Sequence, residues 1–187
     1  MSVDVATLDE TIQLTKTTEL TKAEAIELAR SCGAVVWEGR ATVSKFHADD
    51  DPERATPYEV IESDPNLLLT AGAGLIWSLV TGGAGTVLNS TNARVCVGDS
   101  STAAAAGQTD LQGTNKFRQL VSGAPSLSTN QAVFTATVAT GDANFAWNEA
   151  GIANASSGAT LLNRFVQSFG TKTSASSWTL AITLSLS

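Results

Sequence analysis

The sequence has few of the residues that catalytic sites and disulfide frameworks need. Among 187 residues it contains one His, His47, and two Cys, Cys32 and Cys96. Two cysteines do not make a disulfide framework in a chain of this length, so free, buried thiols are expected, and a disulfide between the two stays open. A Ser-His-Asp triad would have to use His47, and no nucleophile-elbow sequence is present, so His47 is interpreted as a solvated loop residue.

Long apolar runs are missing as well. The longest, from Leu67 to Val80, is too short to span a bilayer and contains two glycines. Residues 1–15 are polar and acidic and lack the apolar core of a secretory signal. We therefore expect a soluble protein that is made in a cytoplasm and has no membrane partner.

Positive charge is scarce and unevenly distributed. The net charge is −7, and because phosphate binding needs clustered Lys and Arg, no nucleic-acid partner is expected. Residues 1–66 hold six Lys and Arg and fourteen Asp and Glu, whereas residues 67–187 hold five and four. This change from acidic to nearly neutral composition predicts a domain boundary near residue 64.

The beginning of the chain is expected to be an extended arm. Residues 1–17 are polar and rich in Thr, with scattered apolar residues that include Leu8, Ile12 and Leu14. Such a stretch does not fold alone. We infer that a partner or a neighbouring copy binds the arm, and that these three residues belong to the contact.

Residues 18–63 are predicted to form an acidic docking segment of one helix and two strands. Thr21 and Glu24 fit a capping box at the start of the helix, and Gly33 fits its end. Strands are predicted over residues 34–46, with an interruption at Gly39, and over residues 58–62.

A second helix is predicted from Asp64 to about Thr81. Asp64 fits the N-cap, Pro65 fits the first helical position, and Gly82 ends the helix. Apolar residues cover most of its circumference, and a helix of this kind is buried in a core or between subunits. Its candidate interface residues are Leu68, Leu75 and Trp77.

From Thr86 onward the apolar period changes to two, which predicts strands separated by Gly, Ser and Asn turns. The predicted strands cover residues 94–97, 117–121, 131–140, 144–154, 161–168 and 177–186. Residues 103–111 are predicted to be a short helix or an ordered loop. The whole chain is thus expected to be mainly β with two helices (α+β), with an antiparallel β-sandwich or jelly-roll-like domain over residues 64–187.

An acidic loop follows the first predicted strand. His47, Asp49, Asp50, Asp51 and Glu53 could offer ligands to a hard cation. Their spacing does not match an EF-hand loop, so a solvated turn is the preferred interpretation, and neither a metal nor a cofactor is expected.

Phe145 and Trp147 lie on one face of a predicted strand and are interpreted as core or interface anchors, with a carbohydrate-binding Trp as the alternative. Asp142 and Glu149 could suggest the carboxylate pair of a glycosidase, but their odd separation places them on opposite faces of a strand. No catalytic residue and no enzymatic activity are predicted.

Several segments between residues 64 and 187 form one pattern. They are Asn66-Leu-Leu-Leu-Thr-Ala-Gly, Ala93-Arg-Val-Cys-Val-Gly-Asp-Ser-Ser-Thr-Ala, Gln108-Thr-Asp-Leu, Gly141-Asp-Ala-Asn-Phe-Ala-Trp-Asn-Glu-Ala-Gly, Leu162-Asn-Arg, Gly170-Thr-Lys-Thr and Trp178-Thr-Leu. This pattern resembles a group of tailed-bacteriophage virion structural proteins, described variously as minor head, decoration or tail-associated proteins. The resemblance brings no catalytic residues.

The resemblance implies a virion component that is made in the host cytoplasm. The first hypothesis is a capsid decoration (cement) protein on the capsid exterior, which binds the major capsid protein lattice and stabilises the head. The second is a tail, baseplate or fibre-associated protein that contacts host glycans. A small homo-oligomer, with a trimer as the expected form, suits either. The third hypothesis, a small hydrolase, requires His47 in a cleft.

Overall fold

The structure is a computed structural model that describes residues 21–34 and 36–186. Within these residues the chain forms two helices and ten strands. The helices are α1 (Lys22–Ser31) and α2 (Thr70–Val80), and the strands are β1 (Trp37–His47), β2 (Glu59–Glu62), β3 (Leu67–Leu68), β4 (Arg94–Gly98), β5 (Lys116–Leu120), β6 (Ser126–Leu127), β7 (Gln131–Val138), β8 (Ala146–Ala153), β9 (Asn163–Thr171) and β10 (Ser176–Leu186).

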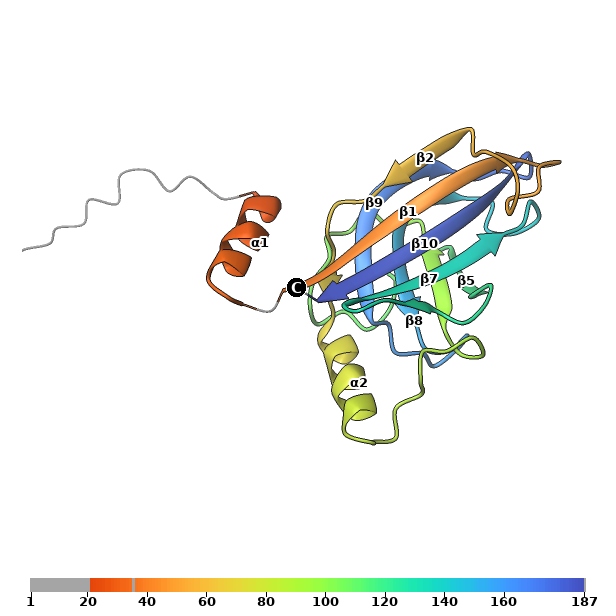
Figure 1. Ribbon diagram of the computed structural model, residues 1–187. Helices are drawn as coiled ribbons and strands as arrows, with labels where there is room; N and C mark the ends of the chain where they lie inside the picture. Colours follow the sequence, from red (N-terminus) through yellow and green to blue (C-terminus); the bar gives the residue numbers. More distant parts are fainter. Residues whose placement is uncertain (1–20, 35, 187) are drawn as a thin grey trace, which may run out of the picture.

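The strands form two antiparallel sheets that pack face to face. The first sheet has the order β2-β1-β10-β7-β6, and the second has the order β3-β9-β8-β4-β5. Both helices lie outside the sheets, near the end of the sandwich where β1 begins and β10 ends (Figure 1). The prediction of a mainly β, antiparallel sandwich with two helices is therefore confirmed.

The first sheet begins well before the predicted domain boundary. β1 pairs with β10 along its whole length, from Trp37 opposite Leu186 to His47 opposite Ser176. β2 pairs with β1, so both strands of the predicted docking segment are part of the sandwich. The predicted boundary between residues 63 and 64 is wrong, because it separates β1 and β2 from the sheet in which they pair. The amino-acid composition changes from acidic to nearly neutral near residue 64, but strands from both sides of that point pair in one sheet.

β1 is continuous through Gly39, and the predicted interruption does not occur. The glycine is needed for a close approach instead. A Cβ atom at Gly39 would lie 2.2 Å from Oδ1 of Asn66, so the segment before β3 packs directly on the β1 backbone.

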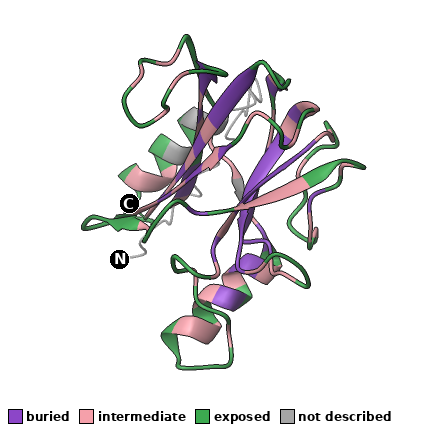
Figure 2. Ribbon diagram, turned by 90° about the vertical axis from the view of Figure 1, so that its right-hand side faces the viewer, coloured by how far each residue is buried: buried purple, intermediate pink, exposed green. Residues whose placement is uncertain are grey.

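The facing sides of the two sheets form the main core. Alternating residues of β1, β7 and β10 in the first sheet, and of β4, β8 and β9 in the second, are buried in one apolar cluster. Figure 2 shows the buried residues concentrated along these strands. Within this core, the rings of Trp147 and Trp178 meet edge to face at 4.8 Å, a favourable arrangement for aromatic pairs.

The second sheet is buried on its outer side as well. Cys96, Ala153 and Leu161 form a smaller cluster there with Leu69 and with Leu111 of the β4–β5 connection, residues 99–115. This connection covers the sheet as an ordered loop, so the loop alternative for residues 103–111 is the observed one. Because this outer face is covered, polar side chains on it are shielded from water and need hydrogen-bond partners within the protein.

Helix α1 begins and ends as predicted. The Thr21 side chain accepts a hydrogen bond from the Glu24 amide, and the Glu24 carboxylate accepts one from the Thr21 amide. Cys32 is the C-cap, and Gly33 follows with a φ of 75°, the left-handed conformation that stops many helices.

Helix α2 begins later than predicted, and it is not buried all round. Leu67 and Leu68 pair with β9 as the short strand β3, so Asp64 and Pro65 do not start the helix. Trp77 is 67% exposed and Val80 is 71% exposed. The apolar composition of α2 therefore gives a helix with one buried side and one apolar surface open to solvent.

Candidate functional site

A buried ion pair lies on the outer side of the second sheet, beneath the β4–β5 loop. Glu149 of β8 and Arg164 of β9 are both fully buried, and Arg164 Nε donates to Glu149 Oε2 at 2.6 Å. Because β8 and β9 are neighbouring strands, the alternation that sends Ala150 and Phe165 into the core sends these two side chains to the opposite face. Two charges removed from water need each other and further hydrogen bonds, and the loop supplies those.

The loop binds the ion pair through backbone and side-chain groups. The amides of Gln112 and Gly113 donate to Glu149 at 3.0 and 2.7 Å, and Arg164 Nη1 donates to Oε1 of Gln108 at 3.0 Å. A Cβ atom at Gly98 would lie 2.3 Å from Glu149 Oε1, so glycine there makes room for the carboxylate. Glu149 and Arg164 thus hold the loop on the sheet.

Other residues of the pattern found in the sequence hold loops in the same way. Asp99 accepts hydrogen bonds from both the amide and the side chain of Asn115, which lower its pKa. Lys172 Nζ donates to the carbonyl oxygens of Ala139 and Asp142 and to Asn144 Oδ1, at 2.7 to 3.1 Å. The segments Gln108-Thr-Asp-Leu, Gly141 to Gly151, Leu162-Asn-Arg and Gly170-Thr-Lys-Thr therefore supply the contacts that fix the loops of the sandwich.

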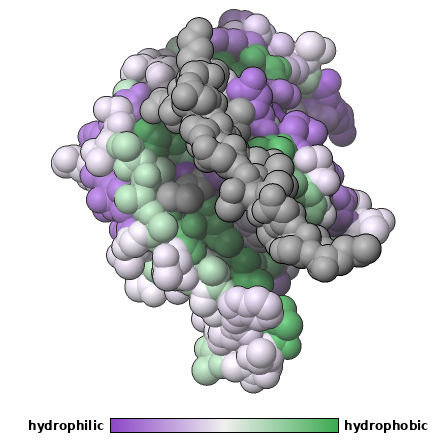
Figure 3. All heavy atoms as spheres, turned by 90° about the vertical axis from the view of Figure 1, so that its left-hand side faces the viewer, coloured by the Kyte–Doolittle hydropathy of each residue, from purple (hydrophilic) through white to green (hydrophobic). Residues whose placement is uncertain are grey.

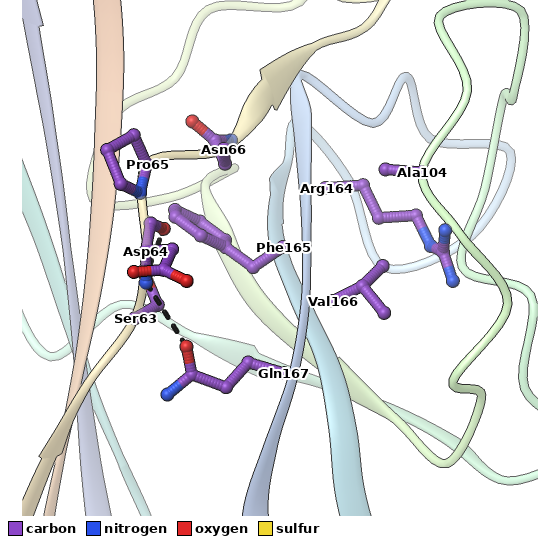
Figure 4. A pocket seen from close by; sticks show the side chains of 9 residues that line it. All are labelled: Ser63, Asp64, Pro65, Asn66, Ala104, Arg164, Phe165, Val166 and Gln167. Atoms are coloured by element: carbon purple, nitrogen blue, oxygen red, sulfur yellow. Dashed lines mark hydrogen bonds between the residues drawn. The ribbon is translucent and has the colours of Figure 1, made fainter. Parts of the chain in front are cut away.

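A pocket of about 360 Å³ lies beside the edge of β9, between that strand and residues 63–66 (Figure 4). The Asp64 amide donates to Oε1 of Gln167 at 3.1 Å, which closes one side of it. Arg164 and Phe165 leave β9 in opposite directions, so Arg164 extends toward Ala104 and away from Asp64 (Figure 4). The Nη2 atom of Arg164 has no hydrogen-bond acceptor among the described residues.

A second, more apolar groove of about 350 Å³ lies at the end of the sandwich where β1 begins and β10 ends. Its walls come from the inner faces of the first sheet, from α2 and from the segment after α2, and they carry no charged side chain among the described residues. Its apolar wall residues include Trp37, Ile76, Leu88, Phe134, Leu184 and Leu186. We name it the end groove.

The end groove contains a buried polar atom that is not satisfied. Trp37 Nε1 is buried and has no acceptor among the residues that the structure describes. A buried N–H group without a partner costs free energy at this end of the sandwich.

Exposed apolar side chains occur next in sequence to residues that line the end groove. Trp77 follows Ile76 on α2, Val87 precedes Leu88, and Leu127 precedes the polar rim at Ser128. Figure 3 shows apolar side chains gathered on the face from which α1 projects. Contiguous apolar surface on a soluble protein commonly marks a contact with another molecule. The end groove and its rim are therefore the best candidate for a functional surface.

The structure distributes the predicted interface residues over three environments. Leu8, Ile12 and Leu14 lie outside the described residues. Leu75 and Trp147 are buried. Trp147 is therefore a core residue, and it offers no exposed surface to a glycan. Leu68 and Phe145 are partly buried against the core. Among the members that the structure describes, only Trp77 is widely exposed, and it follows Ile76 of the end groove in α2.

The acidic loop is organised by its own backbone. Asp50 accepts a hydrogen bond from the His47 amide, Asp51 accepts one from the Glu53 amide, and the ring of His47 stacks on Tyr58 at 4.7 Å. Within the part of the chain that the structure describes, no three His, Cys, Asp or Glu side chains gather in a metal-binding arrangement. His47 is exposed, and it lines none of the three pockets described for this chain.

The two cysteines should differ strongly in reactivity. Both are free, Cys32 is exposed and Cys96 is buried, so the expectation of two buried thiols is wrong for Cys32. Burial raises the pKa of Cys96 to about 12, and the thiolate is the reactive form.

We expect a thiol reagent at pH 8 to label one cysteine in the native protein and both in denaturant, as counted by intact mass. Labelling of both in the native protein would contradict the burial of Cys96.

A scan of protein-family models found no family that matches this chain, and searches of curated proteins and of solved structures found no match either. Among the described residues, neither helix has the length and apolar character needed to cross a membrane.

Proposed function

We propose that this chain is a non-enzymatic structural protein of a tailed-bacteriophage particle, and specifically a capsid decoration protein that binds the major capsid protein lattice on the head exterior. The proposal starts from the sequence resemblance. It is supported by the roles of the resembling residues, because Gln108, Glu149, Arg164 and Lys172 all serve to fix loops on the sandwich. A pattern made of such residues is expected from a family that preserves a rigid scaffold.

The observation that carries the proposal is the apolar surface formed by α2 and the rim of the end groove. Trp77 and Val80 expose apolar area that the described residues do not cover, on a helix held against the backbone of Leu162. Rigid, exposed aromatic residues are typical anchors of protein interfaces. A decoration protein requires a surface of this kind for the lattice.

The alternative, a tail or baseplate protein that contacts host glycans, is favoured by one observation. Trp77 exposes an aromatic face of the sort that stacks on sugar rings. The buried Trp147 gives this alternative no support.

Copy number separates the two locations. We expect quantitative mass spectrometry of purified phage particles to find this chain in many copies that scale with the major capsid protein. A few copies per particle would overturn the decoration assignment in favour of the tail, and absence from particles would overturn both.

Binding to undecorated heads tests the surface. We expect Trp77→Ala, and separately deletion of residues 1–17, to weaken head binding at least tenfold while the sandwich stays folded. Tyr58→Ala is the matched control, because Tyr58 is also an exposed aromatic residue but lies beside the His47 loop. Equal binding by all four proteins would show that neither the arm nor α2 contacts the head.

A further inference from the structure

Helix α1 has an apolar stripe that the described chain leaves uncovered. Ala25, Leu28, Ala29 and Cys32 recur with the three- and four-residue spacing of one helix face. Leu28 is 54% exposed, and Ala25 and Cys32 are exposed as well. In Figure 1 the helix stands apart from the sandwich, beyond the start of β1. Such a stripe gains stability only when another surface buries it.

The end groove is an apolar concavity of the same chain that the described residues leave open. The described residues that line it carry no charge, so an apolar helix face could cover them without removing a charge from water. The small side chains of Ala25, Ala29 and Cys32 allow a helix backbone to approach closely, with Leu28 as the one larger side chain that enters. The two uncovered surfaces therefore match in chemistry.

The position of α1 on its own chain argues against docking in its own groove. Arg30 Nη2 donates to Glu38 Oε2 at 2.8 Å, and this ties the C-terminal turn of α1 to β1. Glu38 alternates with Trp37 and Gly39, whose side of β1 faces the core, so Glu38 lies on the outer face of the sheet. To enter its own groove, α1 would have to give up this partly buried ion pair and turn back within the short link before Trp37.

We propose that the end groove binds helix α1 of a second copy of this chain. In this contact Leu28, which is 54% exposed on its own chain, enters the groove. Because each chain brings one α1 and one end groove to the contact, it closes either as a reciprocal dimer or as a head-to-tail ring, for which the expected trimer is the smallest form. This inference does not rest on a role in a phage particle, and it holds or fails independently of that role.

The oligomeric state tests the contact. We expect light scattering coupled to size exclusion to give the mass of two or three chains, and Leu28→Glu to weaken association at least tenfold, because a carboxylate would be buried in an uncharged groove. Val60→Glu is the matched control, since Val60 is 51% exposed on β2 and lies outside the groove. A monomeric native protein, or an oligomer that Leu28→Glu leaves intact, would overturn the proposal.

A cross-link through the exposed native thiol identifies the partner. Thr129 lies on the groove rim, and we expect Thr129→Cys to form a disulfide with Cys32 of another chain, visible as a dimer or larger species on a non-reducing gel. Ser174→Cys, an exposed position in the β9–β10 turn at the opposite end of β10, is expected to give none. A disulfide between Cys32 and the introduced thiol within one chain would refute the second copy as the occupant, and equal cross-linking by both variants would refute docking in the groove.

Discussion

Glu149→Gln should destabilise the folded protein by about 3–5 kcal/mol, the usual cost of removing one partner of a buried ion pair. Glutamine keeps the shape of the side chain but removes the charge that neutralises Arg164. Both side chains are completely buried, so water cannot replace the lost partner. For a protein whose stability is typically about 5–15 kcal/mol, such a loss is a large fraction of the total. Denaturant unfolding followed by tryptophan fluorescence measures it.

An exposed ion pair supplies the control for this variant. Asp51 and Arg54 lie 3.6 Å apart and are both largely exposed, so Asp51→Asn is expected to change stability by about 0–1 kcal/mol. The double variant Glu149→Gln with Arg164→Met should recover part of the loss, because it removes the uncompensated charge as well. If Glu149→Gln costs no more than Asp51→Asn, the ion pair does not secure the fold.

The loss should also be visible locally. The amides of Gln112 and Gly113 donate to the Glu149 carboxylate. From the wild type to Glu149→Gln, we expect hydrogen exchange at these two amides to accelerate more than exchange at the amides of β10, because the β4–β5 loop is then held less firmly. An equal acceleration in both regions would instead indicate that the variant acts on global unfolding alone.

Strand positions were the most predictable part of the fold, because a period of two in apolar residues directly reflects a sheet with one buried face. The alternation from Trp178 to Leu186 predicted β10 almost residue for residue. The ends of α1 were predictable for a similar reason, since Thr21, Glu24 and Gly33 act through local hydrogen bonds and local backbone conformation. Signals of this kind need no knowledge of what lies across the fold.

Features that depend on distant contacts were not predictable. Asp64 and Pro65 have the local chemistry of a helix start, but pairing of β3 with β9 decides otherwise. The sequence suggests Asp142 as the neighbour of Glu149, and it gives no sign that the partner of Glu149 is Arg164, fifteen residues away on the next strand. The end groove likewise combines residues from β1, α2, β7 and β10, so composition or spacing within one segment could not reveal it.

Gly72 and Gly74 should respond in opposite directions to the same substitution, although both lie in α2. A Cβ atom at Gly72 would lie 2.1 Å from the carbonyl oxygen of Leu162, whereas a Cβ atom at Gly74 would meet nothing within 4 Å. Alanine at Gly74 should therefore stabilise the protein by about 0.5–1 kcal/mol through helix propensity alone.

Alanine at Gly72 should destabilise the protein by about 1–3 kcal/mol, because the obstacle is backbone and cannot rotate away. The shift would strain the hydrogen bond from the Leu69 amide to Leu162, which joins the start of α2 to the second sheet. It would also displace Ile76 in the wall of the end groove. Thermal unfolding of the two variants side by side gives the signs directly. A stabilising Gly72→Ala would mean that α2 does not rest against Leu162. Both proposals would then lack the rigid apolar surface on which they depend.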